Sequence, residues 1–160
     1  MCKEKINEIL DIFIDRFSIL SNLKETDDAR KQKRDLAFEL LSCITIFKVS
    51  PYYAIEECWN AIEKDGIYLN DGEDGKIDGF FVVGDNDKII VSLVQAKNTN
   101  KILQKDIELF FSSIKKYLIE RKSLVKGYTS LNNLLNRIDE ETARYPKAEI
   151  IFKAYISGDI

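Results

Sequence analysis

The chain has 160 residues, a formal net charge of −3 and no histidine, and 45% of its residues are hydrophobic and 32% charged. This balance is typical of one globular domain that is long enough to bury a core. The absence of histidine excludes any mechanism in which a histidine of this chain is the base, and any zinc site with a histidine ligand of this chain. The acidic balance argues against a protein dominated by non-specific binding to nucleic acid. The acidic balance does not exclude a nuclease, because acids clustered at a metal site lower the total charge.

The location of the protein is indicated by what the sequence lacks. It contains no apolar run of the length that crosses a membrane, so we expect no membrane contact. Its first residues, Met-Cys-Lys-Glu-Lys, do not have the layout of a signal peptide. The cysteines Cys2, Cys43 and Cys58 are odd in number and widely spaced, which predicts reduced thiols and neither a disulfide framework nor a zinc site. We therefore expect a cytoplasmic protein.

The first part of the chain is predicted to be helical. Apolar residues recur at helical spacing over residues 4–21 and again over residues 28–47. Pro51 is expected to open a third helix that extends to about residue 64, where Asp65-Gly66 ends it. A polar, glycine-containing loop follows over residues 70–76.

A β-hairpin is predicted next, with strands at 77–84 and 88–97. Its second strand is apolar on both faces, which indicates a central strand covered on each side. Helices are expected over 102–122 and 129–144, and a last strand over 148–156. Because a helical crossover precedes this last strand, it should lie parallel to the second hairpin strand. The order predicts one α/β domain, helical over 1–65 and with an αβ core over 66–160.

Polar residues stand at the open end of this hairpin. Asp78 enters the first strand, and Gln95 and Lys97 end the second, on one face because strand residues alternate. A turn centred near Asp85-Asn86 would place Asp78 opposite Leu93, one residue pair from Gln95. A carboxylate, an amide oxygen and an ammonium group would then converge. Mg²⁺ prefers oxygen ligands and is usually held by one or two carboxylates, and a lysine can offset charge on a reacting phosphate.

These features resemble the PD-(D/E)XK nuclease superfamily in its Gln-x-Lys variant, and more closely the N-terminal domain of the AIPR abortive-infection phage-resistance proteins. In that domain a helix with an Ala-Phe-Glu-like segment precedes an Asp-Gly-x-Ile-Asp-Gly hairpin, a Gln-x-Lys strand, an amphipathic helix and another strand. The matching stretches are Ala37-Phe38-Glu39, Asp74-Gly75-Lys76-Ile77-Asp78-Gly79 and Gln95-Ala96-Lys97-Asn98. The similarity covers roughly residues 30–158. Gln95 departs from the superfamily pattern, in which this position is Asp or Glu.

The resemblance implies a restriction-endonuclease-like mixed sheet flanked by helices, with an N-terminal helical segment. It implies a Mg²⁺- or Mn²⁺-dependent nuclease in phage defence, acting on nucleic acid, with DNA favoured over RNA. Asp78, Gln95, the Ala96 carbonyl and Glu39 would hold the metal, and Lys97 would be the catalytic lysine. The family members are longer than this chain, so further C-terminal domains are expected. Whether the domain forms a homodimer stays open.

Each of these residues also has a plainer interpretation. Glu39 would be an exposed helix acid, Asp78 would end the glycine-rich loop, and Gln95 and Lys97 would be polar strand ends. Asp74 and Asn98 are best interpreted as turn or cap residues. The competing function is a catalytically silent domain that keeps the nuclease-like fold as a module for binding nucleic acid or protein.

Overall fold

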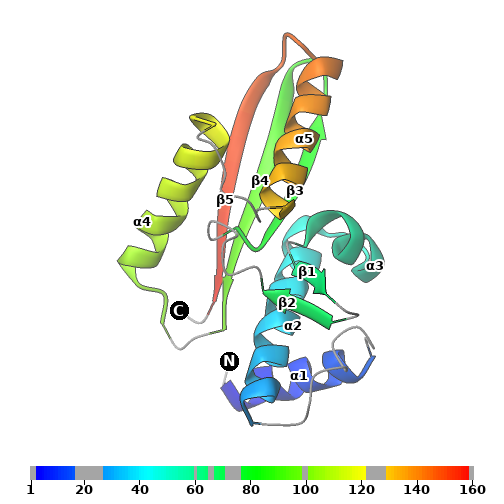
Figure 1. The fold of residues 1–160 in the computed structure, drawn as a ribbon, viewed down its shortest axis with the longest axis vertical. Helices are drawn as coiled ribbons and strands as arrows, with labels where there is room; N and C mark the ends of the chain where they lie inside the picture. Colours follow the sequence, from blue (N-terminus) through cyan, green and yellow to red (C-terminus); the bar gives the residue numbers. More distant parts are fainter. Residues whose placement is uncertain are drawn as a thin grey trace.

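The structure is a computed structural model that describes residues 3–16, 27–59, 61–64, 67–70, 77–98, 101–121 and 129–158. It has an α/β architecture in which a small mixed sheet is flanked by helices, with helices also at the N-terminal end (Figure 1). This confirms the predicted class and the N-terminal helical segment.

The main sheet has the strand order β3-β4-β5. Strand β3 (Gly79–Gly84) pairs antiparallel with β4 (Lys88–Lys97), and β4 pairs parallel with β5 (Glu149–Gly158). The central position of β4 agrees with its apolar residues on both faces. The predicted hairpin and the parallel last strand are therefore confirmed.

The helices agree with the helical periodicity of the sequence. They are α1 (Lys3–Arg16), α2 (Asp27–Phe47), α4 (Gln104–Ser113), which continues into the π-helical turn η3 (Ile114–Ile119), and α5 (Thr129–Arg144). Figure 1 shows α4 beside β5 and α5 over the end of the sheet at which β3 turns into β4. Helix α2 lies near the opposite end of the sheet.

The third predicted helix, over residues 51–64, is wrong in its second half. Helix α3 (Pro51–Tyr53) continues into a π-helical turn, η2 (Ala54–Cys58), in which the Trp59 N–H bonds the Ala54 carbonyl at 2.8 Å. Trp59 then becomes extended and forms an antiparallel bridge with Gly79 of β3. A tertiary contact thus ends the helix, and not the Asp65-Gly66 pair, which lies outside the described residues.

A short hairpin occupies the chain where that helix was expected to continue. Strands β1 (Ala61–Lys64) and β2 (Ile67–Asn70) pair antiparallel as a separate two-stranded sheet. Residue 70 of the predicted loop is the last residue of β2. The rest of that loop, residues 71–76 with Asp74, lies outside the described residues.

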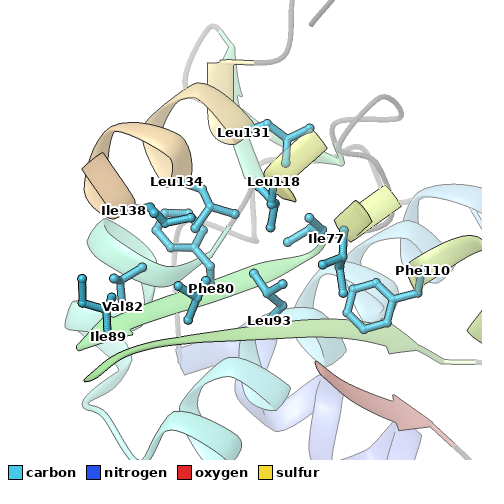
Figure 2. Packing of buried hydrophobic residues seen from close by; sticks show 12 residues of the cluster. Ile77, Phe80, Val82, Ile89, Leu93, Phe110, Leu118, Leu131, Leu134 and Ile138 are labelled. Atoms are coloured by element: carbon cyan, nitrogen blue, oxygen red, sulfur yellow. The ribbon is translucent and has the colours of Figure 1, made fainter. Parts of the chain in front are cut away.

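Two cores cover the two faces of the main sheet. On one face, α1, α2 and the η2 segment bury a cluster that includes Val94 of β4, with Leu10, Leu36, Leu40, Phe47 and Trp59 among its members. On the other face, α4, η3 and α5 cover the residues on the opposite side of β3 and β4. Figure 2 shows this second cluster, which includes Phe80, Val82, Leu93, Phe110, Leu134 and Ile138.

The register of the β3–β4 hairpin differs from the prediction by two residues. Gly79 pairs with Val94 and Gly84 with Ile89, and the pairing begins at Gly79, so Asp78 does not lie opposite Leu93. The turn is centred one residue later than expected, because Asp85 begins it. The Asp85 carboxylate accepts the main-chain N–H groups of Asp87 and Lys88, both at 2.9 Å. A shift of two residues leaves each of the paired side chains on its predicted face. Asp78 precedes the paired residues, and its main-chain N–H bonds the Val94 carbonyl.

Two further expectations concern the chain as a whole. No helix in the part of the chain that the structure describes is both long and apolar enough to cross a membrane. Cys43 and Cys58 are free and buried, whereas Cys2 lies outside the described residues.

Candidate active site

Asp78 is fixed where β3 begins. Its main-chain N–H bonds the Val94 carbonyl at 2.8 Å, and its carboxylate oxygen Oδ2 accepts the Ala96 N–H at 2.7 Å. The side chain therefore replaces a main-chain acceptor and holds the end of β4 against β3. With 7% of its surface exposed, Asp78 lies inside the protein, where a carboxylate requires such hydrogen bonds.

Gly79, next to Asp78, allows helix α2 to approach the strand closely. A Cβ atom at this position would lie 2.2 Å from Cys43 Sγ and 3.2 Å from the Cys58 carbonyl oxygen. Because only glycine lacks that atom, only glycine admits α2 and η2 this close to the start of β3. The helix acid of α2 is thereby brought to the strand end that carries Asp78.

Gln95 carries the least satisfied polar group of the site. Only 3% of the residue is exposed, and its side-chain oxygen Oε1 has no hydrogen-bond partner within the described ranges. Gln95 pairs with Ile156 of β5, on the face that α4 and α5 cover. Leaving a buried acceptor unsatisfied costs about 1–3 kcal/mol, so this oxygen is a ready ligand for a cation.

Glu39 lies on α2 and is buried, with 5% of its surface exposed. Its oxygen Oε2 accepts the indole N–H of Trp59 at 3.3 Å. The interpretation of Glu39 as an exposed helix acid is therefore wrong. The periodicity of α2 places Leu36, Leu40 and Cys43 against the sheet, and Glu39 lies on this inward side, one turn before Cys43.

Cys43 lies one turn after Glu39 on α2 and is buried against Gly79. Burial raises the pKa of Cys43 well above its usual range, and the negative charges of Cys58, Asp78 and Glu39 raise it further. Glu39 and Asp78 are linked through Trp59, which donates its indole N–H to Glu39 and bridges by its main chain to Gly79, the neighbour of Asp78.

Lys97 ends β4 and is held by helix α4. Its ammonium group forms an ion pair with Oδ1 of Asp106. The other oxygen of Asp106 accepts the Leu103 N–H at 3.0 Å and so caps the first turn of α4. Because 26% of the Lys97 side chain and 15% of the Asp106 side chain are exposed, the ammonium is anchored at the strand end and still reaches solvent.

Further polar contacts bind α2 to the same end of the sheet. The Ser42 hydroxyl donates to the Phe38 carbonyl at 2.7 Å and lies 3.0 Å from the Ser157 hydroxyl of β5. Asn98 donates to an Asp35 carboxylate oxygen at 3.3 Å. These bonds fix the helix that carries Glu39.

The structure thus places Asp78 against the Ala96 main chain and, through Trp59, near Glu39 of α2, whereas Gln95 lies on the face that α4 and α5 cover. Lys97 follows on β4 and is directed to Asp106. Over the ranges described, no three or more Asp, Glu, Cys or His side chains are grouped so that they could hold a metal. The predicted ligand set has only two acids and takes its other oxygens from an amide and a main-chain carbonyl.

Two residues of this region were not foreseen from the sequence. Trp59 is the partner of Glu39, and its only signal was being the single tryptophan of the chain. Asp106 is the partner of Lys97, and its signal was an acid three residues after Leu103 at the start of a helical pattern.

Comparison of the chain with protein-family models, with curated proteins and with solved structures found no significant match.

Proposed function

We propose that the chain is a metal-dependent nuclease domain with a restriction-endonuclease-like core, which hydrolyses phosphodiester bonds of nucleic acid, DNA in preference to RNA. The observation that carries this proposal is the buried Oε1 of Gln95, an oxygen without a hydrogen-bond donor among the described residues, one position before Ala96, whose N–H bonds the Asp78 carboxylate. Native proteins leave few buried polar atoms unsatisfied, and an ion is one of the explanations for such an atom.

The residues present fit a hard divalent cation. Mg²⁺ and Mn²⁺ take oxygen ligands, and Mg²⁺ is usually held by one or two carboxylates. Here Asp78, Gln95, the Ala96 carbonyl and Glu39 would hold the ion. When bound, it supplies a Lewis acid that polarises the phosphodiester and lowers the pKa of a coordinated water.

Lys97 has the role of stabilising negative charge that develops on the phosphate. An ammonium group at a half-buried strand end acts in a medium of lower dielectric constant than water. Its effect on a developing charge is therefore larger there than it would be in water. Asp106 keeps this ammonium at the end of β4, so that it is in position before the substrate binds.

The biological setting that we propose is defence against phage by abortive infection. Its support is the similarity of the Asp-Gly-x-Ile-Asp-Gly and Gln-x-Lys stretches to those of the abortive-infection proteins, on elements in the same order.

A specific observation also favours the silent interaction module. Lys97 is paired with Asp106, Asp78 with the Ala96 N–H and Glu39 with Trp59. Each of these bonds contributes to the structure without any metal. Of the proposed site residues, Gln95 alone is not explained by such a role.

Cleavage assays decide between the two functions. Wild type, Lys97→Ala and Lys88→Ala would be incubated with plasmid, single-stranded DNA and RNA, with Mg²⁺, Mn²⁺ or EDTA. We expect metal-dependent cleavage by wild type and a rate about 10²–10³-fold lower for Lys97→Ala, because one electrostatic contact in the transition state is lost. Lys88 is a matched control because it is the exposed lysine at the opposite end of β4, and Lys88→Ala should cleave like wild type.

Circular dichroism of each variant would show that the fold is kept. Equal rates for wild type and Lys97→Ala would assign the cleavage to another site. A wild type that cleaves none of the three substrates but binds one of them would favour the interaction module.

A further inference from the structure

Trp59 connects three parts of the proposed site. It follows the π-helical turn η2, bridges to Gly79 beside Asp78, and donates its indole N–H to Oε2 of Glu39 at 3.3 Å. Only 6% of the residue is exposed. Its ring therefore has a fixed place, and so has the hydrogen bond that it offers to Glu39.

A carboxylate that binds a metal depends on such a donor. Hydrogen bonds from outside the ligand set fix the orientation of ligating carboxylates, and their loss typically lowers metal affinity about 10- to 100-fold. Glu39 comes from a helix and the other proposed ligands come from strands, so its carboxylate needs a contact that ties it to the strand end. Trp59 makes that contact because its backbone is bridged to β3 and its side chain bonds the acid.

We propose that Trp59 is a positioning residue for the metal site, which orients the Glu39 carboxylate toward the ion that Asp78 holds. This inference rests on the metal site of the proposed function. Since Trp59 is the only tryptophan of the chain, its fluorescence also reports on the site. A cation next to the carboxylate changes the electric field on the indole and with it the emission.

The first experiment uses wild type and needs no cleavage. Mg²⁺ would be titrated into the protein while tryptophan emission is followed, and binding would be measured separately by calorimetry. We expect the emission to change with the same midpoint as the calorimetric curve. Glu39→Gln keeps an oxygen for the indole N–H but loses the charged ligand, and its emission should no longer respond at that midpoint.

The second experiment uses Trp59→Phe, which keeps an aromatic ring and removes the donor. Calorimetry should show a dissociation constant for Mg²⁺ that is about 10- to 100-fold higher than in wild type. In cleavage assays the Mg²⁺ concentration for half-maximal rate should rise equally, while the rate at saturating Mg²⁺ largely recovers. Phe47→Leu is the matched control, because Phe47 belongs to the same buried cluster as Trp59. It should disturb packing and leave Mg²⁺ affinity unchanged.

The outcomes separate this inference from the nuclease proposal. Unchanged Mg²⁺ affinity in Trp59→Phe, or wild-type emission that does not follow the calorimetric curve, would overturn the role of Trp59 alone. Mg²⁺ binding with the expected loss in Trp59→Phe, but without cleavage by wild type, would support that role and contradict the nuclease proposal. Absence of any Mg²⁺ binding by wild type would overturn both.

Discussion

Gln95 is the residue at which the proposed metal would change the stability of this protein most directly. Without a cation its buried Oε1 accepts no hydrogen bond from the residues that the structure describes. Gln95→Met keeps the length of the side chain and removes that acceptor. We expect the variant to be more stable than wild type in EDTA, by about 1–3 kcal/mol, and to show no added stability when Mg²⁺ is present. Urea denaturation with EDTA and with Mg²⁺ measures both effects.

Gln95→Glu tests the same oxygen in the opposite direction. A buried carboxylate without a cation is unfavourable, so this variant should be less stable than wild type in EDTA. Mg²⁺ should stabilise it more than it stabilises wild type, because the added charge strengthens binding. If both variants responded to Mg²⁺ as wild type does, Gln95 would not be a ligand.

Cys58 makes the stability of the protein depend on alkaline pH. Burial raises the pKa of Cys58 from 9.0 to about 12; the charge of Glu57 adds to this shift and that of Arg137 opposes it. Above pH 9 the unfolded thiol loses its proton while the folded thiol keeps it, so the unfolded state binds fewer protons and stability falls as pH rises. We expect the unfolding free energy to decline between about pH 9 and pH 12.

Cys58→Ala isolates this contribution. Lysines and tyrosines titrate in the same range in both proteins, so the difference between their stability curves belongs to the thiol. Urea denaturation at several pH values should show a flatter decline for Cys58→Ala. Parallel curves for the two proteins would contradict the raised pKa of this thiol.

The contact between β3 and α2 depends on the absence of a side chain at Gly79. A Cβ there would lie 2.2 Å from Cys43 Sγ, so one of the two elements must shift. We expect Gly79→Ala to lower the unfolding free energy by about 1–3 kcal/mol, as overpacking usually does. Because the shift displaces Glu39 from the strand end, its Mg²⁺ affinity should fall as well.

A double-mutant cycle tests this explanation. Cys43→Ala removes the sulfur that the new methyl group would strike, so the pair Gly79→Ala with Cys43→Ala should lose less stability than the sum of the single variants. Additive losses would show that the Gly79–Cys43 contact is not what limits the approach of α2.

The two cores share β4, which makes the sheet the link between them. Leu134 of α5 is fully buried in the core on one face, and Trp59 is buried in the core on the other. Leu134→Ala should lower stability by about 2–5 kcal/mol. If the chain unfolds as one unit, the transition seen by Trp59 fluorescence should shift together with that seen by circular dichroism.

Asn133→Ala serves as the control for this variant, because Asn133 is an exposed neighbour on the same helix. It should leave both transitions near those of wild type. A Trp59 transition that stays in place while the helical signal melts earlier in Leu134→Ala would divide the chain into two independently folding parts.

The sequence was sufficient for those features that depend on neighbours along the chain. Periods of two and of about 3.6 residues predicted β3, β4, β5 and the main helices, and apolar residues on both faces placed β4 at the centre. Alternation along the strands put Gln95 and Lys97 on one face, and this holds whatever the register of the hairpin, because both residues belong to β4.

The tertiary structure decided what depends on residues far apart in the chain. Trp59 ends the third helix early because it bridges to Gly79 and bonds Glu39, a partner 20 positions away. Lys97 is held by Asp106 through a helix that starts after the strand has ended. Such contacts leave no periodic trace in the sequence, since each one joins two single residues whose meeting depends on how whole elements pack. Local patterns therefore determined the elements, and packing determined which polar groups meet at the end of the sheet.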